Sequence, residues 1–166
     1  TTATIDATRI AMNQGVTNGG GLFSSTLTLR DSEITDNIVT GSTAQGGGLY
    51  ASSTLTVSGT EILRNRADGT SNARGGGVYA NSTSSLTEST IADNEAFASN
   101  RGNGGGLYVS NGQIVIRRST IPGNSVFGAT ESRGGGIIAE HSPELVLNQP
   151  TVSGPPPFGG AAARGG

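Results

Sequence analysis

Residues 46–65 read GGGLYASSTLTVSGTEILRN, and this stretch decides the fold because its three parts return along the chain. A glycine triplet leads into Leu49-Tyr50, an alternating segment follows at Leu55-Thr56-Val57, and an isoleucine stands three residues before Asn65. Apolar and polar side chains alternate in the middle segment, which is the period of a half-buried β-strand. The stretch therefore predicts short β-strands joined by bends.

The glycine triplet recurs at a nearly constant interval. The triplets are Gly19, Gly20 and Gly21; Gly46, Gly47 and Gly48; Gly75, Gly76 and Gly77; Gly104, Gly105 and Gly106; and Gly134, Gly135 and Gly136. Successive triplets begin 27, 29, 29 and 30 residues apart. Self-similarity at such a period is typical of a solenoid in which each repeat stacks on the next.

The same frame reaches both ends of the sequence. Thr4-Ile5 and Ile10 occupy the strand and isoleucine places before the first triplet, and Val152 occupies the isoleucine place after the last. We therefore expect one repeat domain over residues 1–154, followed by a Pro/Gly-rich tail over 155–166. Pro155, Pro156 and Pro157 cannot donate to a β-ladder, so they are expected to blunt that edge.

These features predict an all-β fold: a single right-handed parallel β-helix, or β-solenoid, of about four full coils plus partial terminal coils, with three short strands per coil. A leucine-rich repeat would need a helical or Leu/Asn-patterned segment, and a propeller blade needs about 40 residues. The density of Gly, Thr and Ser argues against helical solenoids. The polar segments before the later triplets (40–45, 67–74, 97–103 and 127–133) are interpreted as loops on one side, where a binding surface would lie.

Stacked coils place like residues on like. An inner aliphatic ladder is predicted from Ile10, Ile34, Ile62, Ile91, Ile121 and Val152. An asparagine ladder is predicted from Asn13, Asn37, Asn65, Asn94 and Asn124. Asparagine tolerates a left-handed bend and can bond both backbone and the next amide, so a structural role is favoured over a metal or sugar site. The triplets are interpreted as corners where backbone passes close to backbone, since no P-loop Lys-Ser/Thr follows them.

Composition excludes several classes of function. The 166 residues carry a formal net charge of −2, all ten basic residues are arginine, and cysteine is absent. No basic surface for nucleic acid is expected, nor a disulfide framework, a thiolate nucleophile or a Cys-bound metal. No apolar stretch approaches the roughly 20 residues of a membrane-spanning helix. We expect no nucleic-acid partner and no membrane span.

No constellation of residues indicates catalysis. Hydrolysis of a glycosidic bond needs two carboxylates at a controlled separation. Asp36 and Asp93 share a column, but Arg64 occupies the coil between them. A β-eliminating lyase would want a Lys or Arg base beside an acidic calcium site, and the sequence has neither lysine nor an Asp cluster. His141 is the single histidine and is interpreted as a surface residue. The sequence thus predicts no enzyme, no cofactor and no metal.

Two surface arrays offer further interpretations. Thr4, Thr28, Thr56 and Thr87 are predicted to share one outer strand face, and such threonine arrays occur on ice-binding solenoids. Threonine is also a good β-former, and the column turns to Val115 and Val146 in later coils. A second array, Arg74, Arg101 and Arg133, precedes successive triplets and is interpreted as part of a solvated rim of mixed charge.

With the GGGLY and IxxN elements established, the chain resembles the repeats of polymorphic outer-membrane-protein type, which are secreted bacterial right-handed β-helices. The resemblance extends over nearly the whole chain, although isoleucine stands where that family often has phenylalanine. It implies a secreted or surface-exposed passenger or adhesin region and identifies no catalytic residue.

The sequence therefore predicts a non-catalytic extracellular or cell-surface structural protein. Such a protein would associate end to end into a filament, or form part of a stalk or adhesin, because an uncovered terminal coil presents unpaired backbone and an open core. A polysaccharide-binding or lyase-like β-helix module is the first alternative, with surface glycans as the partner. An ice-binding threonine face is the second.

Overall fold

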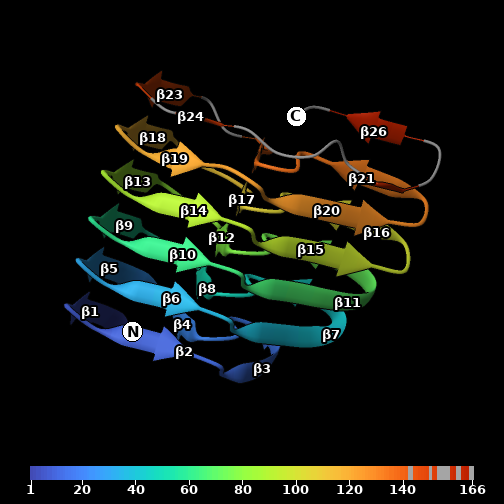
Figure 1. Cartoon of the computed structure of the whole chain (residues 1–166), viewed down its shortest axis with the longest axis horizontal. Helices are drawn as coiled ribbons and strands as arrows, with labels where there is room; N and C mark the ends of the chain where they lie inside the picture. Colours follow the sequence, from blue (N-terminus) through green and yellow to red (C-terminus); the bar gives the residue numbers. More distant parts are fainter. Residues whose placement is uncertain (142–143, 150, 153–157, 160–161, 165–166) are drawn as a thin grey trace.

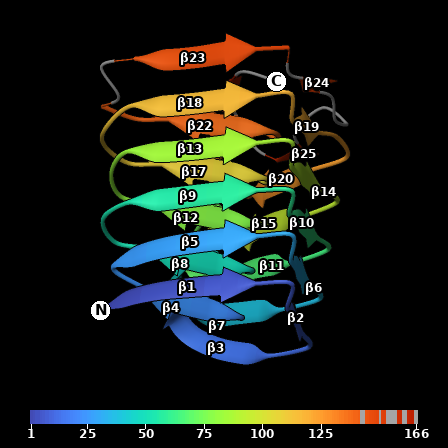
Figure 2. The ribbon, with the colours of Figure 1, turned by 90° about the vertical axis from the view of Figure 1, so that its left-hand side faces the viewer.

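The computed structural model describes residues 1–141, 144–149, 151–152, 158–159 and 162–164, and every regular element in them is a β-strand. All strand pairs join one coil to the next in parallel, so the chain winds into a stack of coils (Figures 1 and 2). The strands form four sheets that run along the stack, here sheets A to D. Counted from each glycine triplet, β4–β7, β8–β11, β12–β16 and β17–β21 are coils, and β1–β3 and β22–β26 continue the stack on either side.

Each sheet collects one strand position from every coil. Sheet A contains β1 (Thr2–Asp6), β5 (Thr26–Arg30), β9 (Leu55–Ser58), β13 (Ser84–Thr87), β18 (Ile114–Arg117) and β23 (Leu145–Asn148). Sheet B contains β2 (Arg9–Ala11), β6 (Glu33–Thr35), β10 (Glu61–Leu63), β14 (Thr90–Ala92), β19 (Thr120–Ile121) and β24 (Thr151–Val152). Sheet D contains β4 (Leu22–Ser24), β8 (Leu49–Ala51), β12 (Val78–Ala80), β17 (Leu107–Val109) and β22 (Ile137–Ala139).

Sheet C lies between sheets B and D along the chain. It contains β3 (Gln14–Asn18), β7 (Ile38–Gln45), β11 (Arg66–Arg74), β15 (Glu95–Ala98), β16 (Arg101–Asn103), β20 (Ser125–Gly128), β21 (Glu131–Arg133), β25 (Phe158–Gly159) and β26 (Ala162–Arg164). β11 pairs with β15 through its first half and with β16 through its second half, so sheet C has two arms. The arms join where the register shifts between Gly69 and Asn72.

Sheets A, B and D enclose the larger of two cores, the main lobe. Their inward side chains are aliphatic because strand alternation sends every second residue into the stack. Ile34, Ile62, Ile91 and Ile121 align in this core and are 0% exposed, while Ile10 in the first coil is half-buried. Val152 pairs with Ile121 through β24, but its side chain lies outside the description.

Sheet C encloses a second, narrower core, the second lobe. Its buried members are Val39, Ala44, Ala67, Ala73, Ala96, Ala98 and Val126. The segments expected to be loops (40–45, 67–74, 97–103 and 127–133) are therefore strands over much of their length, and that expectation was wrong. Their alternation is carried by alanine, whose small side chain suits a narrow lobe, so it does not stand out as an apolar pattern. The three predicted strands per coil describe the main lobe, to which sheet C adds the two arms.

The coil containing Leu86 differs from its neighbours in the residue that fills one inner place. Leu86 aligns with Val57 and Ile116, so Ser84 takes the inner place that Leu55 and Ile114 fill in the neighbouring coils. Ser84 is fully buried and its hydroxyl donates to the Ser82 carbonyl at 3.1 Å. An internal hydrogen bond thus lets a polar side chain replace a core leucine.

The predicted tail contains two short strands. β25 pairs with β20 and β26 pairs with β21, which extends sheet C into residues 155–166. The predicted boundary at 154/155 and the edge-blunting Pro155, Pro156 and Pro157 lie outside the described residues.

Candidate functional site

The predicted asparagines form one continuous hydrogen-bonded column where sheet B leads into sheet C. In each step the Oδ1 of the next asparagine accepts the backbone N–H (2.8–3.0 Å) and the side-chain amide (2.9–3.0 Å) of the one before. The amide nitrogen also donates to the isoleucine carbonyl of the previous coil, as from Asn65 to Ile34 at 2.9 Å. These coil-to-coil hydrogen bonds satisfy the side-chain amides of the buried asparagines, which are Asn37, Asn65, Asn94 and Asn124.

The left-handed bend at this corner does not fall on asparagine, and that part of the expectation was wrong. The residue before it takes the positive φ: 56° at Asp36, 52° at Arg64 and 56° at Asp93. With the turn made one residue earlier, the asparagine side chain points inward to the next coil. The outward residue is then free to be charged.

The glycine triplets face this asparagine column. The first glycine of each triplet has a positive φ between 56° and 67°. A Cβ on the second, as at Gly76, would lie 2.3 Å from the Glu95 carbonyl carbon and from the Gly105 oxygen. A Cβ on the third, as at Gly77, would lie 2.9 Å from the Asn94 amide carbon. The triplet and the asparagine therefore close the waist between the two lobes, and backbone packing accounts for the glycines.

A second ladder, at the corner between sheets A and B, escaped the sequence analysis. Each member stands two residues before the isoleucine of the aliphatic ladder in its coil. The members are Thr8, Ser32, Thr60, Ser89 and Ser119. Each hydroxyl donates to the carbonyl two residues earlier (2.6–2.9 Å) and, from Ser32 onward, accepts the backbone N–H of the previous coil's member (3.1–3.4 Å). The signal was a Ser or Thr in every repeat, hidden because Ser and Thr are abundant elsewhere.

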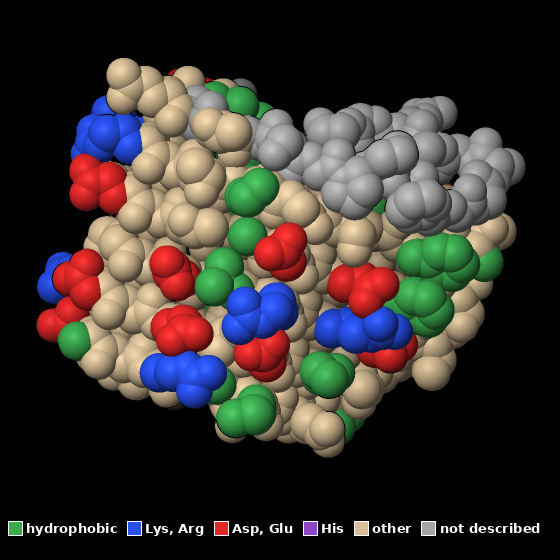
Figure 3. Space-filling model, viewed as in Figure 1, with side chains coloured by type: hydrophobic (Ala, Val, Ile, Leu, Met, Phe, Trp, Pro, Cys, Tyr) green, Lys and Arg blue, Asp and Glu red, His purple; other side chains and the backbone are tan. Residues whose placement is uncertain are grey.

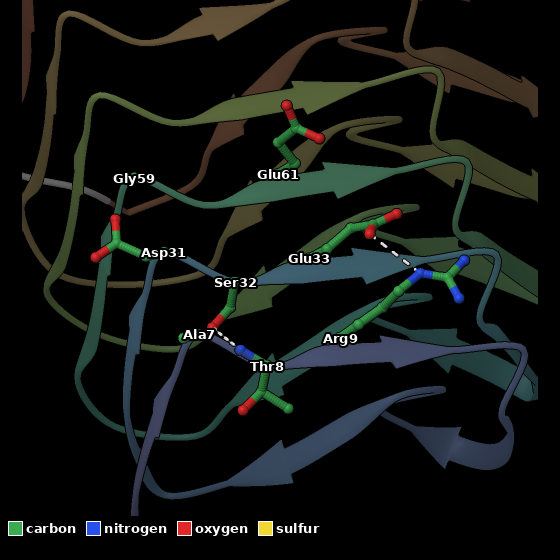
Figure 4. Close-up of a pocket in the computed structure, with 8 residues that line it drawn as sticks. All are labelled: Ala7, Thr8, Arg9, Asp31, Ser32, Glu33, Gly59 and Glu61. Atoms are coloured by element: carbon green, nitrogen blue, oxygen red, sulfur yellow. Dashed lines mark hydrogen bonds and ion pairs between the residues drawn. The ribbon is translucent and has the colours of Figure 1, made fainter.

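A surface hollow lies over this second corner in the first coils (Figure 4). Arg9 Nε binds Glu33 Oε2 at 3.0 Å, and the Ser32 hydroxyl accepts the Thr8 N–H at 3.1 Å. Asp31 and Glu61 stand apart from that ion pair in Figure 4. The carboxylate of Glu33 is thus paired with the Arg9 guanidinium. The described residues contain no group of three or more His, Cys, Asp or Glu able to hold a metal ion.

Several charged side chains over sheets B and C form ion pairs between coils (Figure 3). Arg64 Nε binds Asp36 Oδ1 at 2.9 Å, Arg66 Nη1 binds Glu95 Oε2 at 2.6 Å, and Arg118 binds Glu88 at 2.6 Å. The hydrogen bond from Arg64 lowers the pKa of Asp36. Asp36 is therefore held as a carboxylate that accepts from Arg64, the opposite of a proton-donating catalytic acid.

His141 is exposed and has a positive φ of 52°, which places it at a turn after β22. It does not join a group of metal-ligating or acidic side chains within the described part of the chain.

The outer threonine column on sheet A is shorter than expected. Thr4, Thr28 and Thr56 align, but Ser85 takes the next place, whereas Thr87 aligns with Ser58. The placement of Thr87 in this column was wrong because the coil of Leu86 is shifted by two residues. Val115 and Val146 continue the column, so its hydroxyl face ends midway along the stack.

The three arginines of the second predicted array do not share one column. Arg74 and Arg133 share a column with Asn103 between them, whereas Arg101 aligns with Asn72 two residues earlier. The column is set by the residue directly before each triplet, and that residue is Asn103 in the coil of Arg101.

An aromatic column was not predicted as a unit. Phe23, Tyr50, Tyr79 and Tyr108 stack on the outer face of sheet D with ring centroids 5.2, 4.7 and 5.2 Å apart. Exposure falls from 59% at Phe23 to 5% at Tyr79 and 1% at Tyr108. Burial raises the pKa of Tyr108, and the hydrogen bond from its hydroxyl to Glu140 raises it further. The sequence signal for this column was the aromatic residue that stands two places after each of the first four triplets.

Residues 2–153 match the protein family described as "Right handed beta helix region". The chain belongs to the right-handed β-helix family. No curated protein and no solved structure was found to match it. The described part of this β-helix contains no helix long and apolar enough to cross a membrane.

Proposed function

We propose that this β-helix is a non-catalytic structural protein of the cell surface or extracellular space, and that copies of it associate end to end. The observation that carries the proposal is the exposure of core positions at the two ends of the stack. Leu145 and Leu147 are 43% and 46% exposed in β23, whereas the aligned Ile114 and Ile116 are 0% exposed.

The first coil shows the same contrast. Ile5 and Ile10 are half-buried, although Leu29 and Ile34, which align with them in the next coil, are 0% exposed. Phe23 is the first ring of the aromatic stack. One of its faces packs on Tyr50, no other ring of the stack covers the opposite face, and Phe23 is 59% exposed. A coil laid on this end would bury apolar surface worth about 25 cal/mol per Å².

A second copy of the chain suits both ends. β1 and β23 are the two edges of sheet A in the described residues and run in the same direction. β1 of one copy can therefore continue the parallel ladder from β23 of another, with Ile5 in the column of Leu147. An unpaired strand edge is a template on which another chain can add a strand.

Sedimentation velocity over a range of concentrations, followed by negative-stain microscopy, tests the association. We expect growing assemblies in the wild type and a single small species for Ile5→Lys, which puts a charge on the stacking surface. Val16→Lys is the matched control because Val16, in the same coil, is 78% exposed and aligns with the outward Thr40. A wild type that stays monomeric at every concentration would contradict the proposal.

The absence of catalysis and the surface location need separate tests. The carboxylates Glu33, Asp36 and Glu95, engaged by arginines, support a non-catalytic protein. A lyase or hydrolase assay on acidic polysaccharides should show no turnover. The resemblance to repeats of polymorphic outer-membrane-protein type supports the location, so antibody labelling of intact source cells should detect the chain at their surface.

A further inference from the structure

The outer face of sheet A carries a second threonine column beside the one that contains Thr4. Thr2 in β1 aligns with Thr26 in β5, two residues before the Thr4 column. Thr54 continues the second column, because its carbonyl accepts the N–H of Leu27, the residue after Thr26. The two columns together are here named the threonine face, whose members are Thr2 and Thr4, Thr26 and Thr28, Thr54 and Thr56, and Thr83 and Ser85.

The hydroxyls of the threonine face form no hydrogen bond with another group in the described part of the chain, and all eight residues are exposed or half-buried. Thr8 and Thr60, at the corner beside this face, differ because their hydroxyls donate to backbone carbonyls. A free hydroxyl can donate one hydrogen bond to water and accept two. The threonine face therefore presents a set of hydroxyls that the fold leaves for water.

No charged residue interrupts the threonine face in its four coils. The outer face of sheet B, by contrast, carries the ion pair of Arg9 and Glu33, and that of sheet D carries the aromatic column. In the two coils that follow, Val115 and Val146 replace the hydroxyls of one column. The face thus offers water only hydroxyl and methyl groups.

The hydroxyls lie on a regular two-dimensional grid. The strands of sheet A run side by side in Figure 2, and neighbouring strands of a sheet are about 4.8 Å apart, while residues two apart on one strand are separated by about 6.7 Å. Leu27 and Leu55, which are 1% and 0% exposed, hold the strands from beneath. Threonine is branched at Cβ, so its χ1 angle is already restricted. The grid is therefore ordered before any ligand meets it.

We propose that the threonine face binds the surface of an ice crystal. Water oxygens in hexagonal ice also repeat in rows on a two-dimensional lattice, and one of these repeats is close to the spacing between β-strands. Hydroxyls at that spacing can hydrogen-bond to a layer of lattice water, and because they are held in place beforehand, little order is lost on binding. The face runs along the side of the stack, so this activity goes beyond end-to-end association and does not depend on it.

Nanolitre osmometry of the full chain tests the proposal by measuring the gap between the melting and freezing points of a single ice crystal. We expect a gap and faceted crystals for the wild type. Thr56→Tyr should lose most of the gap, because a large ring in the middle of the grid would hold ice away from the neighbouring hydroxyls. Thr40→Tyr is the matched control, since Thr40 is an exposed threonine on the outer face of sheet C, and it should keep the full gap.

Melting curves of the proteins separate a loss of ice binding from a loss of fold. Thr56 and Thr40 both point outward, so both variants should unfold at the wild-type temperature. Thr28→Tyr repeats the change one coil away and should also lose most of the gap. The proposal is overturned if the wild type neither opens a gap nor shapes crystals, if the folded Thr56→Tyr and Thr28→Tyr keep the full gap, or if Thr40→Tyr loses as much. Adsorption of the wild type to crystalline cellulose without any effect on ice would also overturn it.

Discussion

At the corner between sheets B and C each coil reaches the next through an asparagine, whereas at the corner between sheets A and B it does so through a serine or threonine. The asparagine Oδ1 accepts two hydrogen bonds from the coil before, while the hydroxyl accepts one. The asparagine corner is tight enough that the facing residue must be glycine, as at Gly77 against Asn94. The asparagine side chain thus couples the asparagine ladder to the glycine triplets, whereas the serine or threonine hydroxyl links only one coil to the next.

Replacing Asn65 by leucine should have the largest effect on this comparison. The Asn37 N–H and amide would lose their acceptor, the Ile34 carbonyl would lose its donor, and leucine would crowd Gly48. We expect the free energy of unfolding to fall by about 4 kcal/mol, since each unsatisfied buried group costs roughly 1–3 kcal/mol. Chemical denaturation measures it.

Asn13→Leu is the control for that change, because Asn13 is exposed in the first coil and no asparagine of an earlier coil donates to it within the described residues. Its effect should be clearly smaller. Equal effects at Asn13 and Asn65, or an unchanged melting temperature for Asn65→Leu, would show that the ladder does not stabilise the fold.

Gly76→Ala tests the other wall of the waist. The new Cβ would meet the Glu95 and Gly105 carbonyls at 2.3 Å, and these are backbone groups of the coils themselves. Overpacking of this kind costs about 1–3 kcal/mol, and we expect the upper part of that range. Thermal unfolding followed by circular dichroism measures the loss.

Gly59→Asn is the matched control. Its φ is +55°, which asparagine tolerates, and its Cβ would meet the movable carboxylate of Asp31. If Gly59→Asn were as destabilising as Gly76→Ala, backbone crowding would not explain the triplets.

Ser89→Ala should cost less, because the hydroxyl corner relies on one bond per step. The Thr60 N–H would lose its acceptor at 3.2 Å, for an expected loss of about 1–2 kcal/mol. Ser85→Ala, on the outward face of β13, removes a hydroxyl without a hydrogen-bond partner in the described residues and should be close to neutral. Equal melting temperatures for the two variants would show that the hydroxyl ladder does not stabilise the fold.

The smallest expected effect lies away from both corners, in the pH dependence conferred by Tyr108. Its pKa is raised above the ordinary value of 10.0, so the folded state holds the phenolic proton more tightly than the unfolded chain does. The associated stability is complete below pH 10 and is lost as the pH rises above it. Tyr108→Phe should therefore lose less stability than the wild type between neutral and alkaline pH. Parallel pH profiles of the melting temperature would contradict this.

Much of the main lobe could be read from residue identity. Ile34, Ile62 and Ile91 recur at a fixed place, and a recurring branched aliphatic at a fixed place becomes a buried column once coils stack. The second lobe could not be read in this way, because Ala67 and Ala73 give too weak an apolar pattern. The hydroxyl corner was equally hidden, since Ser89 differs from surface serines only in the partners that stacking supplies.

The sequence by itself determined the coil, its period, and which residues form columns, because identical residues at equal spacing can satisfy one another only by stacking. The tertiary structure decided what no repeat encodes. It placed the positive φ at Asp36 rather than Asn37, folded the expected loops into a lobe, and put Asn103 between Arg74 and Arg133. These outcomes depend on how each coil packs on its neighbours. The contact of the Arg74 guanidinium with the Tyr108 ring is one consequence of that packing.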